Sequence, residues 1–204
     1  MLVHFIWLGG EIPQKYIPNI KLCQQLNTHY RVICWLDRDI EALFTKYGVL
    51  DLANEISFIS KCNLAKYIVL SEYGGIISDL DIKWKKPFTQ IMLDNNFPTV
   101  DLVLTYPAVK EFYLNGKEVL LFDDPFIISK PNVFKSCIDF RLKRPNLRID
   151  VETGRVHKVE PIGPFLLSEW IYTENIRLSY FSQVGYLDGN GHYGNHEQFG
   201  LWKN

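Results

Sequence analysis

The chain has 204 residues, a length that suits one compact domain with a sizeable core. Hydrophobic residues make up 47 % of it, which is typical of globular proteins and excludes general disorder. The 22 Lys and Arg residues nearly balance 23 Asp and Glu residues, so we expect no bulk attraction to nucleic acid. No apolar run approaches the roughly 18 residues of a membrane-spanning helix, and no signal-peptide pattern is present. We therefore expect a soluble, cytoplasmic protein without a transmembrane segment.

Strand and helix patterns alternate over the first 80 residues. Continuous apolar runs predict buried strands at 2–8, 31–36 and 75–78. Helical spacing predicts helices after Pro18, over 38–47 and at about 61–73, the last with Ser60 as N-cap and Gly74 just past its end. This alternation is typical of an α/β fold with a mostly parallel central sheet flanked by helices.

Residues suited to ligand binding lie at the ends of the three predicted strands. Trp7, Leu8 and Gly9 lie at the end of the first strand, Asp37 at the end of the second and Asp79 at the end of the third. Ligands of open α/β sheets bind beyond the carboxyl ends of the strands, so the pattern predicts one shared cleft.

The second half of the chain is less regular. Apolar runs predict strands, and prolines near two helical patterns predict helix starts. The strands are expected within 101–107, 118–124 and 125–130, and the helices within 131–143 and 163–174. The tail, 185–204, is rich in Gly, Asn and aromatic residues and is expected to form a loop on the surface or over a site.

The cysteines and histidines give no zinc pattern. Cys23, Cys34, Cys62 and Cys137 are widely spaced without a CxxC pair, which favours free thiols in a reducing compartment. His192 and His196 are four residues apart, but the segment around them is too rich in glycine to be helical.

The stretch YGGIISDLDIKW, residues 73–84, contains the strongest chemical signal. In an extended segment Asp79 and Asp81 lie on the same side, where each carboxylate raises the pKa of the other unless a cation intervenes. Carboxylate oxygens suit Mg²⁺ and Mn²⁺, which also bind phosphate oxygens. An Asp-x-Asp pair also occurs by chance in solvated turns, so the pair alone does not decide between the two interpretations.

Four motifs occur in order along the chain: VHFIWLGG at the start, CWLD, which ends at Asp37, CNLAKYIVLSEYGGIISDLDI, and HEQFGLW, from His196 to Trp202. Together they resemble the DXD-containing sugar transferases of glycosyltransferase family 32 and the related glucosylating domains of large clostridial toxins. The first two resemble the first strand and loop and the second-strand motif of that group, and the third resembles its central helix, turn and DXD motif. The last resembles its closing motif, with the same spacing from His196 to Trp202. The likeness extends over residues 3–202.

The resemblance implies a GT-A fold, a nucleotide-sugar donor that is most often a UDP-sugar, and Mn²⁺ or Mg²⁺. It implies that Trp7 stacks on uracil beside Leu8 and Gly9, and that Asp37 lies near the nucleoside. It also implies that Trp202 closes over the diphosphate.

The resemblance assigns the metal to the DXD segment and the tail. Asp79 would reach the ribose and the metal shell, with Leu80 beside it, and Asp81 would bind the metal. His196 or Glu197 would complete the metal or diphosphate site.

This sequence departs from the family pattern in the sugar pocket. Asn63 and Lys66 stand where relatives have Asp and Arg, residues that hold the sugar and the diphosphate. Ile77 replaces an aromatic residue, and Leu201 replaces a serine. We interpret these changes as altered donor preference, with a degenerate, ligand-binding relative as the alternative.

Asp123 and Asp124 follow a predicted strand in the second half. Asp124 is our candidate for a further catalytic carboxylate; a solvated turn before Pro125 is the alternative.

We therefore expect a single GT-A-like domain, with a nucleotide-sugar half at about 1–82 and an acceptor half at about 83–204. The expected activity is the metal-dependent transfer of a sugar, with retention of configuration, from a UDP-hexose or UDP-deoxyhexose to a glycan or glycoprotein acceptor. The expected catalytic set is Lys66, Asp79, Asp81 and Asp124. A nucleotide-sugar-binding module and a phosphotransferase are the rival functions, and the short chain is compatible with a domain of a larger protein.

Overall fold

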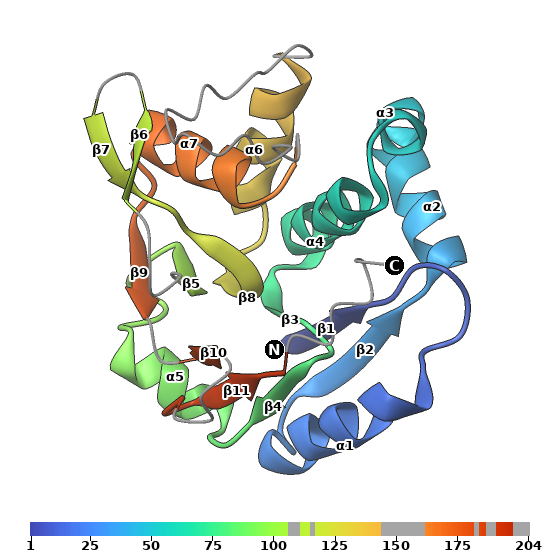
Figure 1. Cartoon of the computed structure of the whole chain (residues 1–204), viewed down its shortest axis with the longest axis vertical. Helices are drawn as coiled ribbons and strands as arrows, with labels where there is room; N and C mark the ends of the chain where they lie inside the picture. Colours follow the sequence, from blue (N-terminus) through green and yellow to red (C-terminus); the bar gives the residue numbers. More distant parts are fainter. Residues whose placement is uncertain (106–110, 115–116, 144–161, 182–183, 187–190, 198–204) are drawn as a thin grey trace.

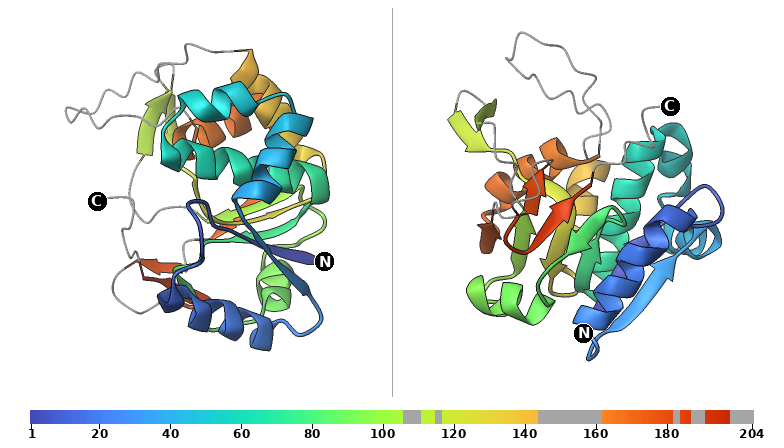
Figure 2. Two further views of the ribbon diagram at one scale, coloured as in Figure 1. Left: turned by 90° about the vertical axis from the view of Figure 1, so that its right-hand side faces the viewer. Right: turned by 60° about the horizontal axis from the view of Figure 1, so that its bottom comes forward.

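A computed structural model describes residues 1–105, 111–114, 117–143, 162–181, 184–186 and 191–197. The chain forms three layers, with a central sheet between two layers of helices (Figures 1 and 2). This arrangement confirms the expected α/β class.

The central sheet has six strands in the order β2-β1-β3-β8-β5-β9. β1 pairs in parallel with β2 and β3, β8 runs antiparallel to both β3 and β5, and β5 pairs in parallel with β9. The strands are β1 (Leu2–Ile6), β2 (Arg31–Trp35), β3 (Gly75–Ser78), β5 (Leu102–Thr105), β8 (Asp123–Ser129) and β9 (Leu178–Phe181). The sheet is continuous across residue 82, so the division into two halves remains a prediction.

Two smaller sheets complete the strands. One has the order β10-β11-β4, and the other is the hairpin β6-β7. Their strands are β4 (Ile82–Trp84), β6 (Glu111–Leu114), β7 (Lys117–Leu120), β10 (Val184–Tyr186) and β11 (Gly194–His196). β11 pairs antiparallel with β4, which places the described part of the tail beside the DXD segment.

Helices cover both faces of the central sheet (Figure 2). The helices are η1 (Gln14–Tyr16), α1 (Ile17–Leu26), α2 (Asp37–Lys46), α3 (Leu50–Glu55), α4 (Phe58–Tyr73), α5 (Phe88–Asp94), α6 (Val133–Leu142) and α7 (Pro164–Glu174). One apolar cluster joins α2, α3, α4, α6 and α7 to one face of the sheet, and a second joins α1, β4 and α5 to the other. Alternation along β3 sends Ile77 to the first cluster and Ile76 to the second.

The Gly74–Gly75 turn joins α4 to β3, and neighbouring backbone atoms leave no room for a side chain on either glycine. Both glycines have positive φ, 60° and 97°. A Cβ on Gly74 would lie 2.6 Å from the nitrogen of Pro131, and one on Gly75 would lie 2.5 Å from the carbonyl oxygen of Leu2. The carbonyl oxygen of Gly74 accepts a hydrogen bond of 2.9 Å from Nε2 of the buried His4. The two glycines therefore let the chain pass close to two neighbouring segments and enter β3.

The structure corrects several local predictions. β2 lies at the edge of the sheet and is only half-buried, and α4 begins earlier than expected, with Ser57 as its N-cap. Part of the tail, expected to be a loop, forms β11. The elements α5, β4, β6 and β9 were not predicted from the sequence, because they are short and lack a clear period.

All four cysteines are free, as expected. In the described part of the chain, no helix combines the length and the apolarity needed to cross a membrane.

Candidate active site

The DXD segment lies at the end of β3, where the chain turns into β4. The backbone N–H of Asp79 donates a hydrogen bond of 2.7 Å to the carbonyl oxygen of Pro125. The indole Nε1 of the buried Trp84 donates to the hydroxyl of Ser78 at 2.9 Å. These contacts fix the turn between two sheets, so that both carboxylates project from a rigid support.

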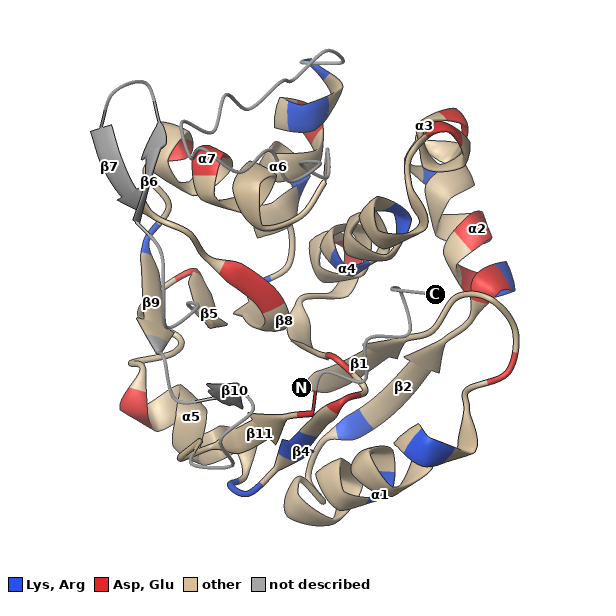
Figure 3. Ribbon diagram, in the orientation of Figure 1, with Lys and Arg blue, Asp and Glu red and all other residues tan. Residues whose placement is uncertain are grey.

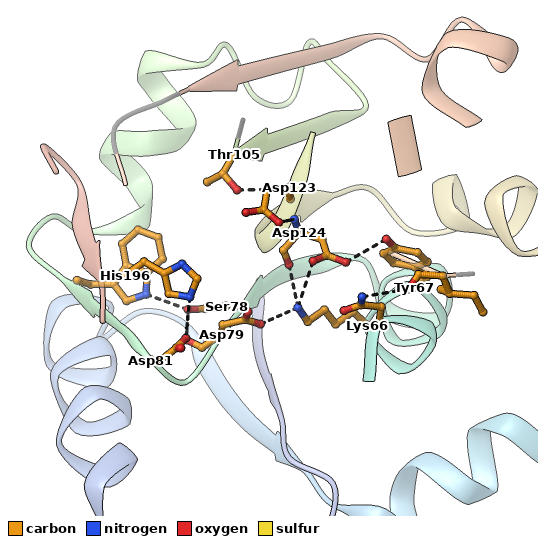
Figure 4. A network of polar contacts seen from close by, with 12 residues as sticks. Lys66, Tyr67, Ser78, Asp79, Asp81, Thr105, Asp123, Asp124 and His196 are labelled. Carbon is orange, nitrogen blue, oxygen red and sulfur yellow. Dashed lines mark hydrogen bonds and ion pairs between the residues drawn. The ribbon is translucent and has the colours of Figure 1, made fainter. Parts of the chain in front are cut away.

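Asp79, Asp81 and His196 bring together three potential metal ligands. One ligand atom from each lies within 4.8 Å of the others. Nε2 of His196 lies 3.0 Å from Oδ1 of Asp81, across the β11–β4 pair (Figure 4). This is the grouping that we predicted from the sequence, apart from Glu197.

The pKa values of the two carboxylates in this group shift in opposite directions. Burial and the charge of Asp81 raise the pKa of Asp79 to about 6, against the attraction of Lys66. Burial also disfavours ionisation of Asp81, but the hydrogen bond and charge of His196 outweigh it and lower the pKa of Asp81. The same contact raises the pKa of His196 against its own burial. A cation between the carboxylates would relieve their repulsion.

Lys66 projects from α4 between the DXD turn and β8. Its Nζ lies 2.7 Å from Oδ1 of Asp79 and 3.6 Å from Oδ1 of Asp124, and it donates a hydrogen bond of 3.1 Å to the carbonyl oxygen of Asp124. Burial alone would lower the pKa of Lys66, but the charges of Asp124 and Asp79 outweigh it and raise that pKa. Lys66 is therefore a buried cation that joins two carboxylates.

Asp124 is a buried group of the site and not a solvated turn residue. Its side chain is 7 % exposed, and its Oδ2 accepts a hydrogen bond of 3.0 Å from the hydroxyl of Tyr67. The pairing of β5 with β8 changes register between Leu104 and Thr105, next to Asp123 and Asp124. Such irregularities redirect side chains beside active sites, and here one places Asp124 against Lys66 (Figure 4).

Asn63 has a structural partner. Its Nδ2 donates a hydrogen bond of 3.1 Å to the carbonyl oxygen of Ile162, while the N–H of Ile162 donates to the hydroxyl of Ser60 at 3.3 Å. A Cβ on Gly163 would lie 2.9 Å from Nδ2 of Asn63. One turn of α4 therefore holds both backbone groups of Ile162, and a carboxylate in place of Asn63 could not make the same donation.

Asp37 holds the loop that follows β1. Its carboxylate accepts hydrogen bonds of 3.0 and 3.1 Å from the N–H of Gly9 and of 3.0 Å from the N–H of Gly10. Burial opposes ionisation of Asp37, but the hydrogen bonds from Gly10 and Gly9 outweigh it and lower its pKa. The segments that follow β1 and β2 therefore lie together, and Asp37 holds the loop after β1 in place.

Trp7 lies half-buried at the base of this loop, and Leu8 is buried in the core. The ring centroid of Trp7 lies 5.4 Å from that of Tyr16. The indole Nε1 of Trp7 is buried and has no hydrogen-bond partner among the described residues. Burial, followed by the charges of Asp81 and Asp79, raises the pKa of Tyr16 to about 12, so this aromatic pair borders the carboxylate group.

Leu80 and Glu197 do not belong to the group of potential metal ligands. The side chain of Leu80 is buried in the core. Nδ2 of Asn19 donates hydrogen bonds of 3.0 Å to the carbonyl oxygen of Leu80 and of 3.0 Å to Oε2 of Glu197. Glu197 is thus held beside α1 and is not in the group with Asp79, Asp81 and His196. Trp202 and Leu201 lie outside the described residues.

Sequence reasoning missed Tyr67, Asn19 and Tyr16 as parts of this region. Tyr67 directly follows Lys66, and its hydroxyl needs a partner when buried, which was a usable signal. Asn19 and Tyr16 reach the DXD turn through the packing of α1 and η1, which no local pattern indicates.

Comparison with known proteins identifies the region that contains this site. Residues 13–98 match the family model described as the glycosyltransferase sugar-binding region containing the DXD motif. This part of the chain is therefore similar to the sugar-binding region of DXD-containing glycosyltransferases. Asp79 and Asp81 are the DXD pair within the matched residues.

One curated relative shares sequence with part of this chain. The chain is 30 % identical over 111 residues to inositol phosphoceramide mannosyltransferase 3 of Schizosaccharomyces pombe, a match that covers 52 % of this chain and 28 % of the relative. The chain thus spans less than a third of that relative's length.

The two solved structures are similar in fold. The PaToxG glycosyltransferase has a TM-score of 0.56 at 15 % identity, covering 85 % of this chain and 69 % of the other. The ligand-free glycosyltransferase domain of the YGT toxin has a TM-score of 0.57 at 8 % identity, covering 98 % and 82 %. The fold is therefore the GT-A fold expected from the sequence.

Proposed function

We propose that the domain transfers a sugar from a nucleotide-sugar donor in a reaction that depends on a divalent metal ion. The observation that carries this proposal is the grouping of Asp79, Asp81 and His196 at the end of β3, beside the buried cation Lys66. Two carboxylates and an imidazole fit Mn²⁺, which accepts both oxygen and nitrogen ligands, and they fit Mg²⁺ through their oxygens. A bound metal ion would supply Lewis-acid stabilisation of the charge on a departing diphosphate.

The residues of the chain would bind and orient the donor around that group. Trp7 offers an aromatic face and a buried indole donor for a base, next to the loop that Asp37 holds. Lys66 contributes positive charge in a buried setting, where charge acts strongly on a diphosphate. Lys66 and Tyr67 orient Asp124, which would contact the sugar or its reacting centre.

We propose a UDP-hexose or UDP-deoxyhexose as the donor and, by resemblance, retention of the anomeric configuration. A glycan or glycoprotein is one candidate for the acceptor. The name of the curated relative favours a second candidate, in which mannose is transferred to a phosphate-bearing sphingolipid. The donor, the stereochemistry and the acceptor are proposals for the whole protein.

Thermal-shift measurements with UDP, GDP and their sugars, each with and without Mn²⁺, test the proposal. A ligand that binds only the folded state raises the melting temperature. We expect UDP plus Mn²⁺ to stabilise the protein, and Asp81→Ala to lose the metal-dependent part. A larger shift with GDP would contradict the UDP assignment and favour a GDP-linked donor, while no shift with either nucleotide would contradict the proposal itself.

Turnover of a UDP-sugar distinguishes a transferase from a nucleotide-sugar-binding module. Slow release of UDP from a UDP-sugar in the presence of Mn²⁺ supports the transferase. Binding without release supports a nucleotide-sugar-binding module. A phosphotransferase is disfavoured because the end of β1 carries Trp7 where such an enzyme would need its nucleophilic Asp.

A further inference from the structure

Positive charge is concentrated in two segments that are distant in the sequence. Residues 12–36 and 82–93 contain six of the Lys and Arg residues and no Asp or Glu, in a chain with 23 acidic residues. Figure 3 shows this segregation on α1, at the start of β2 and on β4. The near-neutral total charge of the chain conceals this local imbalance.

The two segments form one layer of the fold. α1 packs against β4. Oδ1 of Asn27, at the end of α1, accepts a hydrogen bond of 2.7 Å from the N–H of Phe88, the first residue of α5. The hydroxyl of Tyr30 donates to Sδ of Met92 at 3.6 Å. These contacts lie on the face of the central sheet opposite α4 and α6 (Figure 2).

Four exposed side chains define what we call the basic face: Lys21, Arg31, Lys83 and Lys86. Within the described part of the chain, none of the four has a carboxylate partner. Lys15 and Lys85 add charge beside them, although Lys15 also lies over the ring of Tyr16, and Lys85 donates a hydrogen bond to the carbonyl oxygen of Gly191.

Carboxylates outside the DXD turn also border this layer. Glu197 is bound to Asn19, and Asp94, at the end of α5, accepts a hydrogen bond from the hydroxyl of Tyr193. Both are engaged by polar partners of the fold. Among the described residues, neither carboxylate forms an ion pair with Lys21, Arg31, Lys83 or Lys86.

We propose that the basic face binds the surface of a membrane that contains anionic lipids. This inference rests on the proposed function: a transferase whose acceptor is a lipid would need to bind the membrane that contains this lipid. Lysine ammonium groups on flexible stems suit a diffuse layer of phosphate headgroups, and each contributes to attraction near the surface. Leu93 on the adjoining α5, 72 % exposed, adds an apolar side chain that favours a lipid surface over a nucleic acid.

The basic face is also tied to the active site. Asn19 of α1, two residues from Lys21, donates its hydrogen bond to the carbonyl oxygen of Leu80, between the two DXD carboxylates. Docking through α1 and β4 would therefore hold the DXD turn close to the plane of the headgroups.

Co-sedimentation with vesicles tests this proposal without requiring activity. We expect the protein to bind vesicles of phosphatidylcholine mixed with phosphatidylserine, and to bind pure phosphatidylcholine only weakly. Binding should fall as salt is raised. Lys83→Glu/Lys86→Glu should lower the partition coefficient by about tenfold or more, because it reverses two of the charges nearest the surface.

A matched double variant, Lys135→Glu/Lys143→Glu, changes the net charge equally on α6 and just after it, and should bind like the unchanged protein. The inference is overturned if both double variants bind equally well, or if the unchanged protein does not prefer anionic vesicles. Competition by inorganic phosphate alone, without vesicle binding, would also overturn it. The UDP and Mn²⁺ thermal shift should be retained in the Lys83→Glu/Lys86→Glu variant, which shows that the variant is folded and keeps the test of membrane binding separate from the test of the transferase assignment.

Discussion

The ammonium of Lys66 lies 2.7 Å from the carboxylate of Asp79 and so ties helix α4 directly to the DXD turn. The same ammonium contacts the carboxylate and the carbonyl oxygen of Asp124. One buried cation thus sets the relative positions of a proposed metal ligand and a proposed catalytic carboxylate.

Removal of this cation should destabilise the fold. We expect Lys66→Met to lower the free energy of unfolding by about 3 kcal/mol, because it leaves Asp124 and Asp79 without their partner. Adding Asp124→Asn should restore part of that loss, since it removes a buried, uncompensated charge. Urea unfolding of the two single variants and the double variant gives the coupling energy. Strictly additive effects would contradict a direct interaction.

Asn63 should prove to be a structural donor. We expect Asn63→Asp to lower the free energy of unfolding at neutral pH by about 2 kcal/mol, because a carboxylate would face the carbonyl oxygen of Ile162 and donate nothing to it. The defect should shrink in acid, where a protonated Asp can donate again. Denaturant unfolding over a pH series measures this, with Ser60→Ala as a milder control that removes the other contact to Ile162. An unchanged stability would mean that Asn63 is available to the sugar.

Most strands and helices of the first 80 residues could be predicted from the sequence, and the reason is physical. Long apolar runs punctuated by glycines specify β1, α4 and β3 locally, and the rule for the carboxyl ends of parallel strands then brings Asp37 and Asp79 to one edge. The pairing of β11 with β4 is a contact between distant segments, and neither strand has a pattern of its own. The partners of Asn63 and Glu197 were likewise out of reach, because Ile162 and Asn19 meet them only through tertiary packing.

His4 should make stability depend on pH. Its Nε2 donates to Gly74 and its Nδ1 accepts a hydrogen bond of 3.0 Å from the indole of Trp35, so the folded protein favours the neutral ring. Burial lowers the pKa of His4 to about 4, against the hydrogen bond to Gly74, from an ordinary value of 6.5. The unfolded chain therefore takes up a proton between these values, and stability falls as the pH falls through this window.

The comparison with His4→Gln isolates this effect. From about pH 7 to about pH 5, the unchanged protein should lose about 2 kcal/mol more stability than the variant, whose amide can donate and accept without titrating. Chemical denaturation at each pH measures the difference. Parallel stability curves for the two proteins would refute the role of His4.

Gly75 should tolerate no side chain. Gly75→Ala places a Cβ against the carbonyl oxygen of Leu2 at a positive φ, so we expect a loss of about 3 kcal/mol or more. Gly48→Ala is the matched control, since Gly48 has a φ of 66° but no atom within 4 Å of the added Cβ. It should cost only about 1 kcal/mol of backbone strain. Thermal melting distinguishes the two, and equal losses would show that φ alone sets the cost.

Helix α4 contributes Ser60, Asn63, Lys66 and Tyr67 to contacts around the site, and it is buried from Asn63 to Ser71. Any change on this helix that alters sugar preference therefore also alters the stability of the protein. Laboratory evolution of a new donor specificity should find its first tolerated mutations elsewhere, on the loops at the strand ends. Mutations in α4 should appear only after the protein has gained stability at other positions.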